Sequence, residues 1–188
     1  MRFYNVLDLE TTGLNPYSDC IVEVGVLMVR NGVVYRQYQQ LVHPSKPIPS
    51  EVTAINHITN EMVADQPEVG EVMQTVYDML RGYPIVGHNI GFDMSFLMAT
   101  GVDFTLKGKR KGFDTLTFAR EKYPYMQHRL GDMAEHFHII ADKAHTALGD
   151  CQTTYLLFEA YQREFGDLSP SDIFKRQEAS NDKVLPFE

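Results

Sequence analysis

Several common features are scarce or missing in this 188-residue chain. It has two cysteines, Cys20 and Cys151, and no Cys-x-x-Cys pair, which excludes a disulfide framework and a cysteine-based zinc site. No stretch approaches the ~18 consecutive apolar residues that a membrane-spanning helix needs. The N-terminus also lacks the layout of a signal peptide. We therefore expect a cytoplasmic protein without membrane association.

An excess of positive charge is also missing. The chain has 17 basic and 25 acidic residues, a formal net charge of −8, which by itself disfavours nucleic acid as a partner. The basic residues are unevenly spread, however, because seven of the 17 lie within residues 107–129. The run Lys107-Gly108-Lys109-Arg110-Lys111 there is either a grip for a phosphate backbone or a solvated loop tip.

The remaining pattern is that of a folded domain, with 44% hydrophobic and 22% charged residues. Three β-rich runs come first, and the turn signal Asn31-Gly32 joins the second and third into a hairpin. Helical spacing dominates from residue 50 onward, with a short strand at 83–86 and a last long helix at about 146–164. This order predicts an α/β or α+β domain over residues 1–167 and a polar, mobile tail over 168–188.

An acidic pair ends the first predicted strand. Asp8 and Glu10 are two residues apart, so their side chains project from the same face. Like charges this close repel each other unless a cation lies between them, and oxygen ligands suit Mg²⁺ or Mn²⁺. The alternative is an ordinary solvated strand end.

Two further segments place polar residues at helix starts. His88-Asn89-Ile90-Gly91-Phe92-Asp93 follows the short strand, and Asn89 and Asp93 share a helix face. His145-Thr146-Ala147-Leu148-Gly149-Asp150 opens the last helix, with Thr146 as a candidate cap. Taken singly, helix capping and a favourable helix dipole explain each segment.

Together the three segments resemble the DEDDh group of 3′–5′ exonucleases, which includes the proofreading subunit of bacterial replicative DNA polymerase. The resemblance covers roughly residues 3–165. Its motifs are Val6-Leu7-Asp8-Leu9-Glu10-Thr11-Thr12-Gly13-Leu14, the two segments above, and the connecting motif Ile55-Asn56-His57-Ile58-Thr59. It implies a ribonuclease H-like α/β fold, in which a mixed central sheet with an N-terminal antiparallel hairpin is flanked by helices. Residues 1–167 would then be the exonuclease domain.

The resemblance also implies hydrolysis by two divalent metal ions, Mg²⁺ or Mn²⁺. Asp8 would bridge the ions, Glu10 and Asp150 would complete the shell of the first, and Asp93 would coordinate directly or through water. His145 would be the general base, since its ordinary pKa of about 6.5 suits proton abstraction near neutral pH.

Substrate contacts follow from the same motifs. Thr11, Thr12 and Leu14 match positions that touch the terminal nucleotide through backbone amides and an apolar wedge. His88, Asn89 and Phe92 match positions that line the entry of the strand. Phe92 is either a platform on which a base stacks or a core residue packed against Phe96.

The predicted function is a metal-dependent 3′–5′ exonuclease of the proofreading or repair type, acting on the 3′ end of single-stranded DNA and releasing nucleoside 5′-monophosphates. One alternative is a 3′–5′ exoribonuclease that degrades RNA or short oligonucleotides. Others are a non-catalytic module that binds a 3′ end or a polymerase, and a phosphoesterase for small molecules. The resemblance to the proofreading group makes a DNA polymerase a candidate partner. The C-terminal Leu185-Pro186-Phe187 loosely resembles peptides that dock on sliding clamps, so a clamp is another candidate; a frayed terminus is the default.

Overall fold

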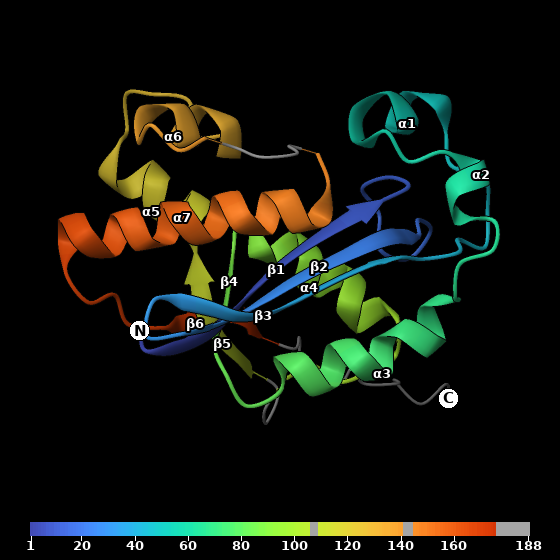
Figure 1. Ribbon diagram of the computed structural model, residues 1–188, viewed down its shortest axis with the longest axis horizontal. Coiled ribbons are helices and arrows are strands. Elements are labelled where there is room, and N and C mark those ends of the chain that lie inside the picture. The colour runs from blue at the N-terminus through green and yellow to red at the C-terminus, as the bar shows by residue number, and fades with distance from the viewer. Residues whose placement is uncertain (106–108, 141–144, 176–188) are drawn as a thin grey trace, which may run out of the picture.

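A computed structural model describes residues 1–105, 109–140 and 145–175 of the protein. A six-stranded mixed sheet forms its centre, and helices cover both faces (Figure 1). The strands lie in the order β3-β2-β1-β4-β5-β6. In chain order they are β1 (Phe3–Thr11), β2 (Ile21–Arg30), β3 (Val33–Leu41), β4 (Ile85–Gly87), β5 (Lys109–Asp114) and β6 (Ser171–Lys175). The strand pairs β1–β2, β2–β3 and β5–β6 are antiparallel, and β1–β4 and β4–β5 are parallel.

Helices occupy the chain from residue 50 onward, where the sequence predicts them, and the last one lies close to the predicted range of about 146–164. They are α1 (Ser50–Asn56), α2 (Asn60–Val63), α3 (Val69–Leu80), α4 (Ile90–Ala99), α5 (Thr115–Lys122), α6 (Leu130–His136) and α7 (Ala147–Phe165). Hydroxyl caps set two of the starts, because Thr59 accepts from the Met62 amide and Thr146 accepts from the Gly149 amide. None of the described helices is both long and apolar enough to cross a bilayer.

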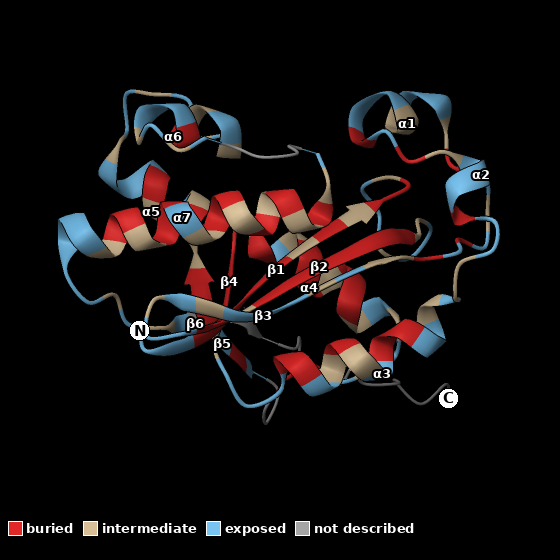
Figure 2. Cartoon of the chain, viewed as in Figure 1, coloured by how far each residue is buried: buried red, intermediate tan, exposed pale blue. Residues whose placement is uncertain are grey.

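Successive side chains of β1 point alternately into two hydrophobic cores, one on each face of the sheet. Leu7 and Leu9 face the core that α3 and α4 cover, whereas Tyr4 and Val6 face the core beneath α7. Buried residues fill most of β1, β2 and β4 and the inner surfaces of α3, α4 and α7 (Figure 2). Because Asp8 and Glu10 share the parity of Tyr4 and Val6, they lie on the α7 side. The predicted mixed sheet with an antiparallel hairpin is therefore confirmed.

The described part of the basic run, residues 109–111, does not form the predicted loop tip. Residues 109–111 begin β5, and Arg110 is only 3% exposed. Its guanidinium donates to the carbonyl oxygens of Leu80, Tyr83 (2.7 Å) and Phe104 (3.1 Å). Both interpretations of the run were wrong for Arg110, because its charge binds backbone carbonyls inside the fold. Lys107 and Gly108 lie outside the described residues.

Part of the predicted tail belongs to the sheet. Residues 171–175 form β6, which pairs antiparallel with β5 at the edge. A short polar edge strand has little of the hydrophobic alternation that sequence patterns detect. Residues 176–188, including Leu185-Pro186-Phe187, lie outside the described part of the chain.

Candidate active site

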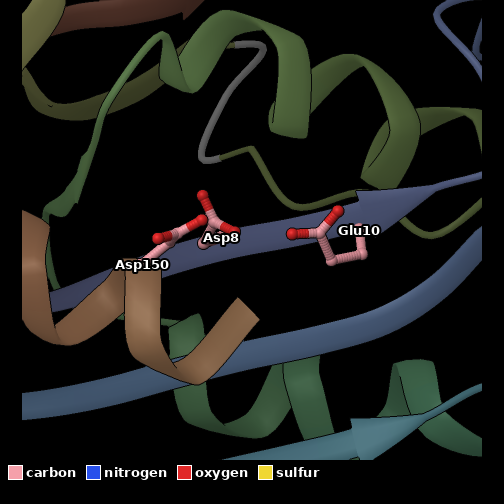
Figure 3. Close-up of side chains that lie close together, drawn as sticks. All are labelled: Asp8, Glu10 and Asp150. Atoms are coloured by element: carbon pink, nitrogen blue, oxygen red, sulfur yellow. The ribbon is translucent and has the colours of Figure 1, made fainter. Parts of the chain in front are cut away.

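Three carboxylates meet where the end of β1 faces the start of α7. Asp8, Glu10 and Asp150 each present an oxygen, and these oxygens all lie within 4.8 Å of one another (Figure 3). The two β1 residues point toward α7 through strand parity, and Asp150 lies in the first turn of that helix. An all-oxygen donor set of this size fits a hard divalent cation such as Mg²⁺ or Mn²⁺.

A glycine on β2 allows this approach of helix to sheet. Gly25 pairs with Asp8 across the β1–β2 ladder. A Cβ at Gly25 would lie 2.4 Å from both the backbone carbon and the backbone oxygen of Ala147. The first turn of α7 therefore rests directly on the β2 backbone, which places Asp150 opposite Asp8.

Gly25→Ala is expected to lower the free energy of unfolding by about 1–3 kcal/mol or more, because α7 must move away from the sheet. Urea unfolding followed by circular dichroism measures the change. Gly70→Ala is the matched control, since nothing lies within 4 Å of a Cβ there. At this exposed position in the first turn of α3, the control should stabilise by about 0.5–1 kcal/mol. Equal stability of Gly25→Ala and the parent would contradict the close contact.

A buried glutamate that the sequence patterns did not identify holds the same helix start. Glu23 Oε2 accepts from the Ala147 amide at 2.7 Å, and Oε1 accepts from Gln39 Nε2 at 2.7 Å. Glu23 faces Glu10 across the strand pair. It thus fixes the backbone two residues after His145. The available signal was one charged residue within the otherwise apolar run 21–29.

Asp93 reaches the site from α4 without joining the three-carboxylate group. It is buried, and its Oδ1 accepts from the Leu9 amide at 3.0 Å. That bond holds the backbone between Asp8 and Glu10. The structure thus places Asp93 beside the site, where one of its oxygens anchors β1; its role in coordination stays a prediction.

Burial and mutual repulsion dominate the electrostatics of the cluster. Burial, reinforced by the charges of Asp93 and Asp150, raises the pKa of Asp8 well above its usual range. Burial also raises the pKa of Asp93 strongly, and burial with the charge of Asp150 raises that of Glu10 to about 8. For Asp150, burial raises the pKa, and the His145 amide and imidazole partly offset the rise. A divalent cation would relieve this concentration of negative charge.

These shifts predict how the metal-free protein responds to pH. A carboxyl group whose pKa is raised on folding binds more protons in the folded state. Stability therefore falls as pH rises from the unfolded pKa through the folded one. For Glu10 that window runs from about 4.5 to about 8. The melting temperature in EDTA should fall between pH 5 and pH 8.

Manganese should reverse that loss at pH 8, by about 2.7 kcal/mol when its concentration is a hundred times Kd. Scanning calorimetry with and without MnCl₂ measures both effects. The double variant Asp8→Asn/Glu10→Gln should lose most of the pH dependence and the response to manganese. A melting temperature at pH 8 that manganese leaves unchanged would argue against the cation site.

His145 lies on the exposed rim of the cluster. It precedes α7 and has a left-handed backbone, with φ 66°. Its ring centroid lies 6.4 Å from that of His57, which also has a positive φ, at the end of α1. The sequence patterns placed His57 only in a connecting motif and assigned it no partner. The structure places both imidazoles at the rim of the site.

The β1–β2 turn uses its threonines internally. The Thr11 hydroxyl donates to the Gly13 carbonyl at 2.6 Å, and the Thr12 hydroxyl accepts from the Cys20 amide at 2.9 Å. Leu14 is 84% exposed just beyond this turn. The threonines therefore shape the turn, and Leu14 is the apolar group that remains available to a ligand.

The second motif lies at the carboxyl ends of β4 and β5. His88 interacts through Nδ1 with Thr115 Oγ1 at 2.9 Å and through Nε2 with the His128 carbonyl at 2.8 Å. Burial lowers its pKa. Asn89 is the N-cap residue of α4, with φ 67°, but its side chain makes no capping hydrogen bond. Its backbone amide donates to Asp114 Oδ1.

Phe92 is half-buried, and its ring centroid lies 4.9 Å from that of Phe96. The core interpretation of Phe92 thus describes the contact that the structure shows. Its partial exposure leaves the stacking interpretation open as a prediction.

Comparison with known proteins agrees with this geometry. A family model described as Exonuclease matches residues 6–158, so the chain belongs to the exonuclease family. The family match, the sequence relatives and the fold together support a DEDDh exonuclease of the ribonuclease H-like superfamily. The predicted resemblance is therefore confirmed.

Two sequence relatives and one solved structure illustrate what the chain is similar to. The chain is 33% identical over 163 residues to DNA polymerase III subunit epsilon of Treponema pallidum, covering 82% of this chain and 74% of that protein. It is 30% identical to the PolC-type DNA polymerase III of Bacillus cereus, over 97% of this chain but only 14% of that polymerase. Exonuclease X, solved in complex with 5′ overhanging duplex DNA, superimposes with a TM-score of 0.75 at 26% identity, covering 88% of this chain and 95% of that one.

Proposed function

We propose that this exonuclease hydrolyses terminal phosphodiester bonds of single-stranded DNA in the 3′–5′ direction and releases nucleoside 5′-monophosphates in a metal-dependent reaction. The observation that carries the proposal is the meeting of Asp8, Glu10 and Asp150 within 4.8 Å. Three carboxylates this close, with Asp93 beside them, would repel a polyanion unless cations neutralised them. Membership of the exonuclease family supports the same reaction class.

Two divalent cations, when bound, would supply water activation and stabilisation of charge on the leaving 3′-oxygen. Asp8, Glu10 and Asp150 are the residues that would hold them. Asp93 keeps β1 in position through its bond to the Leu9 amide. His145 takes the proton of the attacking water on its imidazole, and its place on the rim leaves the ring accessible. Leu14 then packs against the terminal base.

DNA is the proposed substrate because the two sequence relatives described above are a DNA polymerase and a DNA polymerase subunit, and Exonuclease X was solved with DNA. A role in proofreading or repair, with a DNA polymerase as partner, is supported by the similarity to the epsilon subunit. The same bacterial polymerase relatives support a place of action in the cytoplasm.

A product ladder tests the reaction. Matched single-stranded DNA and RNA, each labelled at the 5′ end, are incubated with the protein and Mg²⁺ or Mn²⁺, and the products are separated by length. Stepwise shortening of the labelled DNA, with mononucleotides released, is the expected result. Internal cuts, cleavage that persists in EDTA, or preferential shortening of RNA would each overturn the corresponding part of the proposal.

A further inference from the structure

The structure separates the exposed basic residues of 109–129 into two groups at opposite ends of β5. Lys109 and Lys111 are exposed near the start of the strand, beside β6. Arg120, Lys122 and Arg129 lie on α5 and on the connection to α6, after the strand has ended. β4 and β5 run parallel, and Gly87 at the end of β4 pairs with Asp114 at the end of β5. The second group therefore comes after the same end of these two strands as His88.

Direct contacts tie the second group to the second motif. His88 interacts with Thr115, the first residue of α5, and with the carbonyl of His128, the neighbour of Arg129. The Asn89 amide donates to Asp114 Oδ1 at 3.0 Å. Burial lowers the pKa of His88, and the charge of Arg120 adds to that shift. The surface of α5 and the following connection is therefore continuous with the predicted entry of the strand.

Two of these cations lack a carboxylate partner in the described part of the chain. Arg120 and Arg129 are exposed, and no carboxylate of residues 1–105, 109–140 or 145–175 forms an ion pair with either guanidinium. Lys122 differs, because it pairs with Glu121 at 2.8 Å and lies over the ring of Phe118. Residues 115–131 contain three Lys or Arg and one acidic residue, in a chain whose net charge is −8.

A fully exposed aromatic ring lies between the two arginines in sequence. Tyr125 is 100% exposed in the connection between α5 and α6. The connection has internal support, since His128 Nε2 interacts with the Tyr123 carbonyl at 2.8 Å and the Arg129 amide donates to Asp132 at 3.2 Å. An aromatic ring held at a supported but solvent-facing position offers a π-face to a flat ligand.

We propose that Arg120, Tyr125 and Arg129, here called the α5–α6 track, bind the single-stranded nucleic acid upstream of its terminal nucleotide. The inference rests on the proposed function and names a binding surface outside the carboxylate cluster. Guanidinium groups pair with phosphate oxygens in a bidentate manner, and a tyrosine ring stacks on any base without sequence preference. A local positive surface also offsets the repulsion between an acidic protein and a polyanion.

The salt dependence of binding tests the two arginines. A fluorescent oligothymidylate is titrated into the Asp8→Asn protein, which is chosen so that the strand is not degraded, at several salt concentrations. Arg120→Ala/Arg129→Ala should reduce the slope of log K against log salt by about 1.4, since each phosphate contact on a single strand contributes about 0.7. Lys109→Ala/Lys111→Ala removes the same charge at the other end of β5 and should leave the slope unchanged. Arg120→Lys/Arg129→Lys should restore it.

The aromatic contribution has its own signature. Tyr125→Ala should weaken binding by about 5-fold or more with no change of slope, while Tyr125→Phe should bind like the parent. Equal salt slopes for Arg120→Ala/Arg129→Ala and Lys109→Ala/Lys111→Ala would overturn the proposed role of the α5–α6 track. The proposal would also be overturned if Arg120→Ala/Arg129→Ala weakened binding to polyglutamate but not to the oligonucleotide, because the surface would then fit an acidic protein partner.

A minimal substrate separates this proposal from the catalytic one. The p-nitrophenyl ester of thymidine 5′-monophosphate is too short to reach beyond the terminal nucleotide. Arg120→Ala/Arg129→Ala, in the background with Asp8 intact, should hydrolyse it at the parent rate and lose efficiency only on oligonucleotides. If the parent hydrolyses neither substrate, the proposed function fails, while the salt slopes still decide whether the track binds nucleic acid.

Discussion

Replacement of Asp8 by Asn is expected to lower nucleotide release by at least about 10³-fold, corresponding to about 4 kcal/mol of lost transition-state stabilisation. Asp8 is the central member of the group formed with Glu10 and Asp150. Its amide replacement keeps the size of the side chain but removes an anionic oxygen ligand. The measurement is kcat/KM on 5′-labelled single-stranded DNA with Mn²⁺.

The same variant should fold, and should even be more stable than the parent in EDTA. Burial and neighbouring carboxylates raise the pKa of Asp8, so removing its charge relieves a penalty in the folded state. Asp78→Asn is the matched control, because this exposed residue on α3 is engaged only with Gln74 and Arg81 among the described residues. Full activity in Asp8→Asn would remove the basis of the mechanism.

Replacement of His145 by Ala is expected to lower kcat by about 10²–10⁴-fold, the usual contribution of a general base. The exposed ring at the start of α7 needs no rearrangement of the core to lose its side chain. Circular dichroism and the melting temperature should therefore match those of the parent. The ascending limb of the pH–rate profile, which reports deprotonation of the base, should be flattened.

His138→Ala provides the control for that experiment. His138 is also exposed and also has a left-handed backbone, with φ 55°, but lies after α6 rather than before α7. It should keep both the rate and the pH profile of the parent. A His145→Ala protein with an unchanged ascending limb would show that another group accepts the proton.

Local sequence patterns predicted the features that depend only on residues close together in the chain. The parity of Asp8 and Glu10 along β1, the cap at Thr146 and the turn at Asn31-Gly32 all follow from neighbours in the chain, and the structure has each of them. The same patterns failed at residues 109–111. There, a charged side chain alternates inward, and its carbonyl partners come from residues up to 30 positions away.

Other features depend on contacts that no local pattern encodes. Glu23 looks like an isolated charge in a buried strand until Ala147 supplies its amide across 124 positions. Gly25 looks like a weak strand residue until the backbone of α7 lies against it. The division of the basic residues into two groups likewise appears only once β5 is in the sheet.

From its sequence alone, this protein could be recognised as a DEDDh exonuclease with an acidic motif on its first strand and another on its last helix, because spacing and side-chain chemistry are local properties of the chain. Only the tertiary structure decided that Asp8, Glu10 and Asp150 lie within 4.8 Å of one another, that Asp93 bonds the β1 backbone and that Arg110 is buried. The reason is physical: the sheet order and the contact at Gly25 set these distances, and both arise from packing between segments that are far apart in the chain.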